Sequence, residues 1–192
     1  CSMINKMPGI YEDKFSNLKC GYSFMVGHPG KKLIFMGQDF GQFQEWSEAR
    51  ELDWYLLAEE KHQQLQSYVA DLMHLYQSSK ALYELDYDPQ GFEWINADDA
   101  DRSIFSFLRH SKDGKNNLLF VINFTPVARP DYRVGVLKKK QYKLVLNSDE
   151  AKYGGSGKEQ PQTYKAEEAE CDGKPYSFAY DLPAYGAAVF RF

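Results

Sequence analysis

The sequence contains no long apolar run and few cysteines. No stretch approaches the roughly 20 apolar residues that a membrane-spanning helix needs, and residues 1–7 lack the apolar centre of a signal peptide. The three cysteines, Cys1, Cys20 and Cys171, are odd in number and lack metal-ligand spacing. This usage favours reduced thiols over a disulfide framework, so we expect a cytoplasmic protein without a membrane partner.

An excess of positive charge is also absent. The 192 residues include 23 Lys and Arg against 27 Asp and Glu, which gives a formal net charge of -4. Nucleic acids and anionic membranes attract proteins through clustered cations. The charge balance therefore gives no reason to expect either as a partner, and a neutral substrate is the natural expectation.

Motifs for several common chemistries are missing as well. No Gly-x-Ser-x-Gly element frames a serine nucleophile, and no Lys-Ser/Thr pair follows the glycine-rich run 154–157 to bind phosphate. His62 and His74 are twelve residues apart, and neither has an acidic residue at i+3 or i+4. The sequence therefore predicts no serine hydrolase, no phosphate-binding loop and no metal site.

Aromatic residues, by contrast, are abundant. The chain has 3 Trp, 14 Tyr and 13 Phe, together 16% of its residues. Aromatic faces stack on sugar rings, but aromatic side chains also fill the cores of β-sandwiches. Composition alone leaves both interpretations open.

The first half of the chain has the hydrophobic pattern of helices. Residues 11–25 place apolar side chains on one helical face, and residues 60–79 do so again at i, i+3, i+4 and i+7 spacing. Between them, the apolar run 33–36 is bounded by lysines and a glycine, which is typical of a buried parallel strand. The polar and aromatic loop 37–59 then follows, and loops of that length are usually functional.

The second half changes to the shorter period of β-strands. Asp113-Gly114 lies between two such runs as a hairpin signal, and we expect an antiparallel sandwich of seven or eight strands. The sequence places the change near residues 86–91, which predicts two domains, residues 1–88 and 89–192. The predicted strands are 92–97, 103–110, 117–124, 131–136, 141–146, 176–182 and 186–192.

Packing raises a difficulty for the first 85 residues. A single strand between two helices leaves its own edges unpaired and the apolar faces of both helices uncovered. We therefore expect the isolated chain either to self-associate or to leave this half partly mobile.

Three stretches of the first half are similar to the last helix-strand-loop unit of bacterial glycogen branching enzymes, members of the alpha-amylase superfamily. The β-rich half continues the resemblance in the expected order, so it covers essentially the whole chain. The matching stretches in the first half are 6–9 with 14–18, 28–42, and 45–46 with 52–54; those in the second half are 82–86, 91–95, 123–127, 131–136, 146–149 and 153–157.

The resemblance implies a fold and an activity. The fold implied is mixed: the incomplete C-terminal end of a (β/α)8 barrel, with 33–36 as its eighth strand, followed by an all-β antiparallel sandwich. The reaction implied is retaining transglycosylation, in which α-1,4 glucan links are cleaved and re-formed as α-1,6 branches, with no cofactor. The family's catalytic carboxylates precede Cys1, so no catalytic residue is assigned here, and we expect a fragment that is inactive alone.

The same resemblance places the 37–59 loop at the rim of the active site, because barrel chemistry lies at the carboxyl ends of the strands. The candidate residues for contact with an α-glucan partner are Gln38, Asp39, Glu45, Trp46 and Trp54. Each has a structural alternative: the acidic residues can shape the loop, and the tryptophans can anchor it. Asp39 replaces the family's commoner Glu, and its shorter side chain puts a long-reach contact in doubt.

Two other functions remain open at this point. The chain could be a non-catalytic carbohydrate-binding or domain-packing module, in which aromatic residues such as Trp94 hold glucan. It could also be part of another alpha-amylase-superfamily enzyme, such as a debranching or trehalose-forming enzyme.

Overall fold

Helices and strands occupy separate halves of the chain. The computed structural model describes residues 1–192. The helices are α1 (Tyr11–Gly27) and α2 (Glu60–Ser78). The strands are β1 (Phe92–Asp99), β2 (Ile104–Arg109), β3 (Leu118–Asn123), β4 (Arg129–Val136), β5 (Gln141–Asn147), β6 (Thr163–Lys165), β7 (Tyr176–Leu182) and β8 (Ala187–Arg191). Both predicted helices and every predicted strand of the second half are present.

The strands form two antiparallel sheets. The larger has the order β1-β2-β3-β8-β5-β6, and the smaller pairs β4 with β7. Apolar side chains from both sheets, among them Val121, Phe178 and Phe190, bury one core between them. The predicted antiparallel sandwich is confirmed. The sequence did not predict β6, because its three residues, Thr163–Lys165, are polar and mostly exposed.

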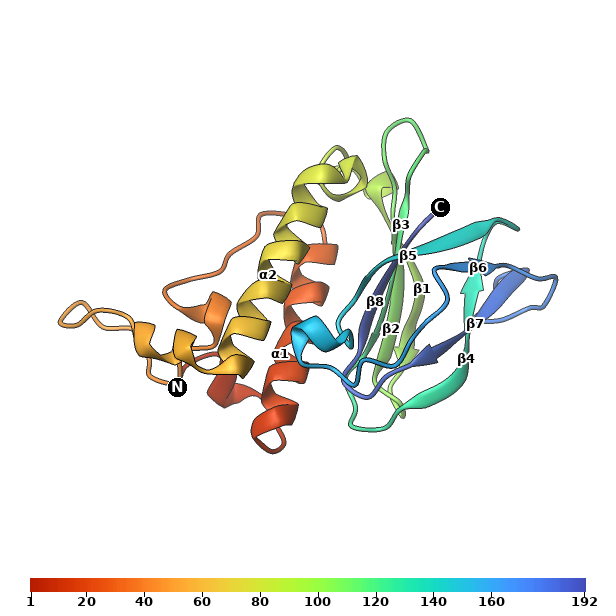
Figure 1. Ribbon diagram of the computed structural model, residues 1–192. Helices are drawn as coiled ribbons and strands as arrows, with labels where there is room; N and C mark the ends of the chain where they lie inside the picture. Colours follow the sequence, from red (N-terminus) through yellow and green to blue (C-terminus); the bar gives the residue numbers. More distant parts are fainter.

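The two helices lie side by side over the outer face of the larger sheet, so the molecule has three layers (Figure 1). Leu18 of α1 and Leu72 of α2 share a second core with Phe107 and Phe120 of the sheet, and all four are buried. The expectation that the helices' apolar faces lie uncovered is therefore wrong. The part of the expected self-association or mobility that depended on uncovered helix faces loses its basis, because the sheet covers these faces.

The boundaries of α1 follow from its local sequence. Glu12 and Asp13 lie in the first turn, where negative charge favours the helix N-terminus, and the Asp13 carboxylate accepts from the Ile10 backbone N–H at 3.3 Å. The helix ends one residue before His28, because Pro29 disfavours helical geometry at the residue that precedes it. Neither helix combines the length and hydropathy that crossing a bilayer requires.

The predicted strand 33–36 is not formed in this chain. Residues 31–35 belong to no helix or strand, they join neither sheet, and Leu33 is 72% exposed. A parallel strand exists only through hydrogen bonds to neighbouring strands, and both sheets of this chain are antiparallel and distant in sequence. Leu33, Phe35 and Met36 are therefore exposed, while Ile34 packs against the core that contains Leu18 and Leu72.

The predicted boundary region marks a change of secondary structure within continuous packing. The short 3-10 helix Pro89–Gly91 leads directly into β1. The core that contains Leu18 and Leu72 nevertheless extends across this point to Phe107 and Phe120. The helical layer and the sandwich are thus joined by one buried apolar cluster.

Candidate functional site

The 37–59 loop begins with a tight turn that requires two glycines. A 3-10 helix, Gln38–Phe40, lies between Gly37 with φ of 79° and Gly41 with φ of 70°. A Cβ at Gly41 would also lie 2.9 Å from Leu65 of α2, closer than packed atoms allow. Glycine supplies both the left-handed backbone and the close approach to the helix.

Side chains of both helices form hydrogen bonds to this turn. The Tyr22 hydroxyl of α1 donates to the Gln38 carbonyl at 2.7 Å, and Gln66 of α2 donates to the Asp39 carboxylate at 3.1 Å. Burial raises the pKa of Tyr22, so its hydroxyl stays protonated as a donor. Asp39 is therefore directed towards α2, where it shapes the turn.

Three of the five candidate residues come together at a small pocket. Gln38, Glu45 and Trp46 line it with Phe35, and it encloses only about 10 Å³. That volume holds about one water molecule, so the pocket itself cannot contain a sugar ring. The Trp46 ring meets Phe35 edge to face at 5.2 Å and is 39% exposed. Its free surface is available for stacking.

Trp54 lies apart from that pocket, at the start of the 3-10 helix Trp54–Ala58. Its ring centroid is 5.5 Å from that of buried Phe40, and 52% of the residue is exposed. The loop and the run before it thus present an unusual number of exposed apolar side chains. They are Leu33, Phe35, Met36, Trp46, Trp54 and Tyr55.

A second hollow lies beside the edge strand β1. Trp94, Asn96, Asp98 and Asp172 line an open cleft of about 520 Å³. The Trp94 ring is half-exposed and rests on an aromatic cluster that includes Phe92 at 5.0 Å and Phe107 at 5.6 Å. The lining includes an amide, two carboxylates and a partly exposed tryptophan, which are residue types that contact sugars.

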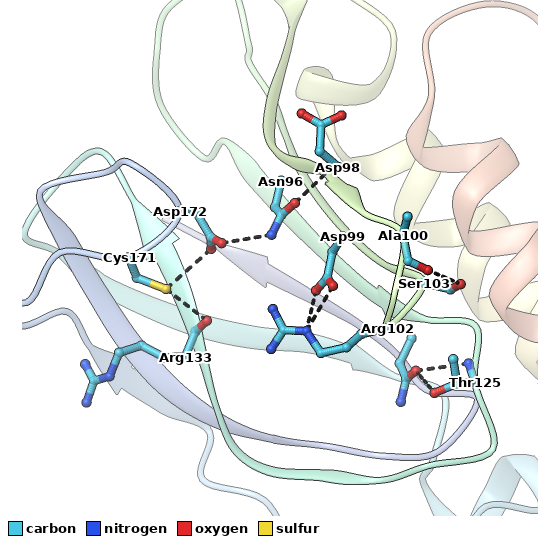
Figure 2. A network of polar contacts seen from close by, with 11 residues as sticks. Asn96, Asp98, Asp99, Ala100, Arg102, Ser103, Thr125, Arg133, Cys171 and Asp172 are labelled. Carbon is cyan, nitrogen blue, oxygen red and sulfur yellow. Dashed lines mark hydrogen bonds and ion pairs between the residues drawn. The ribbon is translucent and has the colours of Figure 1, made fainter.

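The polar floor of this cleft connects the two sheets. Asn96 of β1 donates to the Asp172 carboxylate at 2.9 Å (Figure 2). The same carboxylate accepts from the Gly135 backbone N–H of β4 at 3.0 Å. Nearby, Arg102 pairs with Asp99 at 2.8 Å. No local sequence pattern shows that the Asp172 side chain reaches both β1 and β4.

The thiol in this network is not an activated nucleophile. Cys171 donates to the Arg133 carbonyl at 3.3 Å (Figure 2). Burial, with the Asp172 carboxylate beside it, raises the pKa of Cys171 to about 11. Because the thiolate is the reactive form, this cysteine is protonated and unreactive near neutral pH.

The sandwich matches a known family. The pattern of the family described as "Alpha amylase, C-terminal all-beta domain" covers residues 94–192, more than half of the chain. The chain belongs to the alpha-amylase C-terminal domain family. The match begins at Trp94 of β1 and runs through β8, so it covers both sheets of the sandwich and leaves the helical layer outside it.

Relatives of the chain extend the match to the helical layer. A 1,4-alpha-glucan branching enzyme GlgB from Butyrivibrio fibrisolvens is 53% identical over 192 residues, which is 100% of this chain and 30% of that enzyme. The enzyme of the same name from Halothermothrix orenii is 45% identical over 190 residues, 99% of this chain and 30% of its own length. The resemblance expected from the sequence is confirmed. The chain spans 30% of the length of these curated relatives.

The fold of this member of the alpha-amylase C-terminal domain family also occurs in solved structures. An alpha-amylase from H. orenii has a TM-score of 0.57 and 17% identity, over 92% of this chain and 35% of that chain. At that identity the likeness concerns the fold alone. It supports the antiparallel sandwich, with helices packed on one face, as a shared arrangement.

Proposed function

We propose that this chain is the C-terminal part of a 1,4-alpha-glucan branching enzyme. The whole protein would cleave α-1,4 links in a glycogen-type glucan and re-form them as α-1,6 branches, in the cytoplasm. The observation that carries the proposal is identity of 45–53% along essentially the whole chain to enzymes of that name. The chain itself contributes no catalytic carboxylate and is expected to be silent alone.

In this proposal, residues 1–88 complete the (β/α)8 barrel and residues 89–192 form the domain that closes it. The run 33–36 supports the first part. Its residues Leu33, Phe35 and Met36 are exposed and it pairs with no strand, as an eighth strand would be without its neighbours. Parallel strands on either side would satisfy the backbone and bury the side chains together.

The 37–59 loop would then lie at the rim of the active site, where it contacts α-glucan. Trp46 and Trp54 are the stacking residues, because both present free ring surface to solvent. Gln38 and Glu45 lie beside Trp46 and supply hydrogen bonds to sugar hydroxyls. Asp39 accepts a hydrogen bond from Gln66, so it orients the turn and does not contact the substrate.

A chimera tests this proposal directly. The region of the Butyrivibrio fibrisolvens enzyme that corresponds to this chain is replaced by residues 1–192, and branching is followed by the loss of iodine staining of an amylose substrate. The chimera should branch, whereas the isolated chain should not. A soluble, folded chimera without activity, or clear branching by the isolated chain, would overturn the proposal.

Variants of the chimera separate rim contacts from folding. Trp46→Ala should raise KM for glucan by about three- to tenfold, the usual contribution of an aromatic contact. Tyr87→Ala serves as the matched control, because Tyr87 is the most exposed aromatic residue of the chain and lies outside the loop. Equal kinetics for the Trp46→Ala variant and this control would remove Trp46 from the rim.

One observation favours a second function, in which the sandwich holds glucan away from the reaction. The cleft at β1 has Trp94, Asn96 and Asp172 in its lining, and its volume of about 520 Å³ is within the range of ligand pockets. Retardation of the isolated chain in a gel that contains glycogen tests this function. Loss of retardation with Trp94→Ala, but not with Trp46→Ala, would assign the binding to the sandwich.

A further inference from the structure

His62 is a fully buried histidine whose surroundings are almost entirely apolar. It lies in the first turn of α2, next to the 37–59 loop. Phe15 of α1 and Phe43 of the loop each meet its ring edge to face, both with centroids at 5.0 Å and interplanar angles of 89°. The imidazole thus fills the space between a helix and the loop.

A single hydrogen bond gives this ring its orientation. Nδ1 lies 2.6 Å from the carbonyl oxygen of Phe40, the last residue of the tight turn. A carbonyl can only accept, so the proton of the neutral ring must be on Nδ1. Nε2 is buried and has no hydrogen-bond partner. A proton on Nε2 would be an unsatisfied buried donor, so the Nδ1–H tautomer is the form that fits.

This bond complements the one that α1 makes to the same turn. Tyr22 holds the carbonyl of Gln38 at the start of the 3-10 helix, and His62 holds the carbonyl of Phe40 at its end. Phe40 in turn lies under Trp54, with ring centroids 5.5 Å apart. The hydrogen bond to Phe40 therefore positions the ring against which Trp54 packs. It also positions the start of the segment that leads to Trp46.

We propose that His62, as the neutral Nδ1–H imidazole, is the positioning residue of the 37–59 loop, so that Trp46 and Trp54 are presented to α-glucan in one arrangement. The first part of the proposal, that His62 orders the loop, rests on the geometry of the turn. The second part, that the ordered loop contacts glucan, rests on the proposed function. His62 touches no substrate itself, because the residue has no exposed surface.

Two variants in the full chain separate the hydrogen bond from the packing. His62→Phe fills the site between Phe15 and Phe43 but provides no donor. His62→Asn leaves a void but places an amide N–H close to the position of Nδ1. Hydrogen exchange of residues 37–46 should become about tenfold faster in His62→Phe and return towards the wild-type rate in His62→Asn.

A purely structural histidine predicts the reverse order. If packing alone mattered, His62→Phe would preserve the loop and His62→Asn would loosen it, which would overturn the proposal. The tautomer provides a check that needs no variant. Nitrogen NMR of the labelled imidazole should show a protonated Nδ1 and a bare Nε2, and a proton found on Nε2 would contradict the assignment.

Glycogen retardation of the same variants tests the second part of the proposal. His62→Phe should weaken retardation, and His62→Asn should restore it, in parallel with loop exchange. If the loop loosens while retardation stays at the wild-type level, the link to glucan is overturned and the positioning role stands. If the chimera that carries wild-type residues 1–192 does not branch, the proposed function fails. Hydrogen exchange of the 37–59 loop still decides the role of His62.

Discussion

A single buried cation, Arg109, joins three parts of the chain. Its side chain is fully buried and donates to the Asp86 carboxylate at 2.6 Å, the Gly27 carbonyl at 2.8 Å and the Gly91 carbonyl at 3.1 Å. These partners lie at the end of α1, in the connection between the halves and just before β1. Arg109→Met removes all three bonds and strands a largely buried carboxylate. We expect the free energy of unfolding to fall by about 3–5 kcal/mol in urea denaturation.

An exposed ion pair provides the control for this prediction. Lys139 pairs with Glu168 at 2.7 Å, but both side chains lie in solvent. Lys139→Met should leave the urea midpoint unchanged, because solvent screens such pairs. An Arg109→Met variant as stable as Lys139→Met would show that the three parts are held together without this residue.

Lys19 predicts how stability depends on pH. Its ammonium group is buried and donates to the carbonyls of Ser148 and Tyr153, both at 2.8 Å, and burial lowers its pKa from 10.5 to about 8. Between these values the unfolded chain binds more protons than the folded chain, so this group makes the unfolding free energy rise with pH. Relative to Lys19→Met, the wild type should gain on the order of 1 kcal/mol from pH 8 to pH 9.5. Denaturant titration of both proteins at each pH measures the difference.

The window of that prediction is set by the tyrosines. Burial raises the pKa values of Tyr68 and Tyr153, so near and above pH 10 their ionisation in the unfolded chain destabilises the fold. Comparison with Lys19→Met cancels their contribution, because both proteins contain them. A constant difference between the two proteins from pH 8 to pH 9.5 would contradict the lowered pKa of Lys19.

Two glycines of α1 differ in how closely the helix packs against the larger sheet at their positions. A Cβ at Gly27 would lie 2.7 Å from Phe107 and 3.0 Å from Phe120, whose stacked rings are both fully buried. Gly21 has no atom within 4 Å of its Cβ position. We expect Gly27→Ala to cost about 1–3 kcal/mol and Gly21→Ala to gain about 0.5–1 kcal/mol. Thermal unfolding should therefore shift in opposite directions, and a shift of the same sign for both would contradict this fit.

At the scale of elements, the sequence predicts structure where local patterns determine it. The helix over 11–25 and the strands β1 to β5 follow from hydrophobic periodicity and turn residues, which are local signals. The run 33–36 has the composition of a buried strand but lacks partners, and pairing is not a local property.

For the candidate site too, the sequence predicts some features and not others. Exposed tryptophans such as Trp46 and Trp54 could be predicted from a long aromatic loop. The contacts of His62, Arg109 and Asp172 could not, because each reaches a residue at least 18 positions away in sequence. Such contacts follow from the packed fold and leave no local pattern. His62 in particular carries no motif, and only its buried hydrogen bond distinguishes it.

At the scale of the whole molecule, two cores connect three layers. One core joins the helices to the larger sheet and includes Phe120, and the other joins the two sheets and includes Phe178. Alternate side chains of β3 point into each core: Phe120 and Ile122 into the first, Leu119 and Val121 into the second. Neither core can lose its packing without disturbing this shared strand, so we expect the helices and the sandwich to unfold as one unit.

Substitutions in the two cores test that expectation. Phe178→Ala removes a buried ring from the core that the helices do not touch, at a cost of about 3–5 kcal/mol. If unfolding is cooperative, the slowest-exchanging amides of α1 and α2 should lose as much protection as those of β3 in hydrogen exchange. Phe120→Ala should produce the same pattern from the other core. Helical amides that keep their protection in Phe178→Ala while those of β3 lose it would show that the helical layer is a separate folding unit, because only an independent layer could remain closed when the shared strand opens.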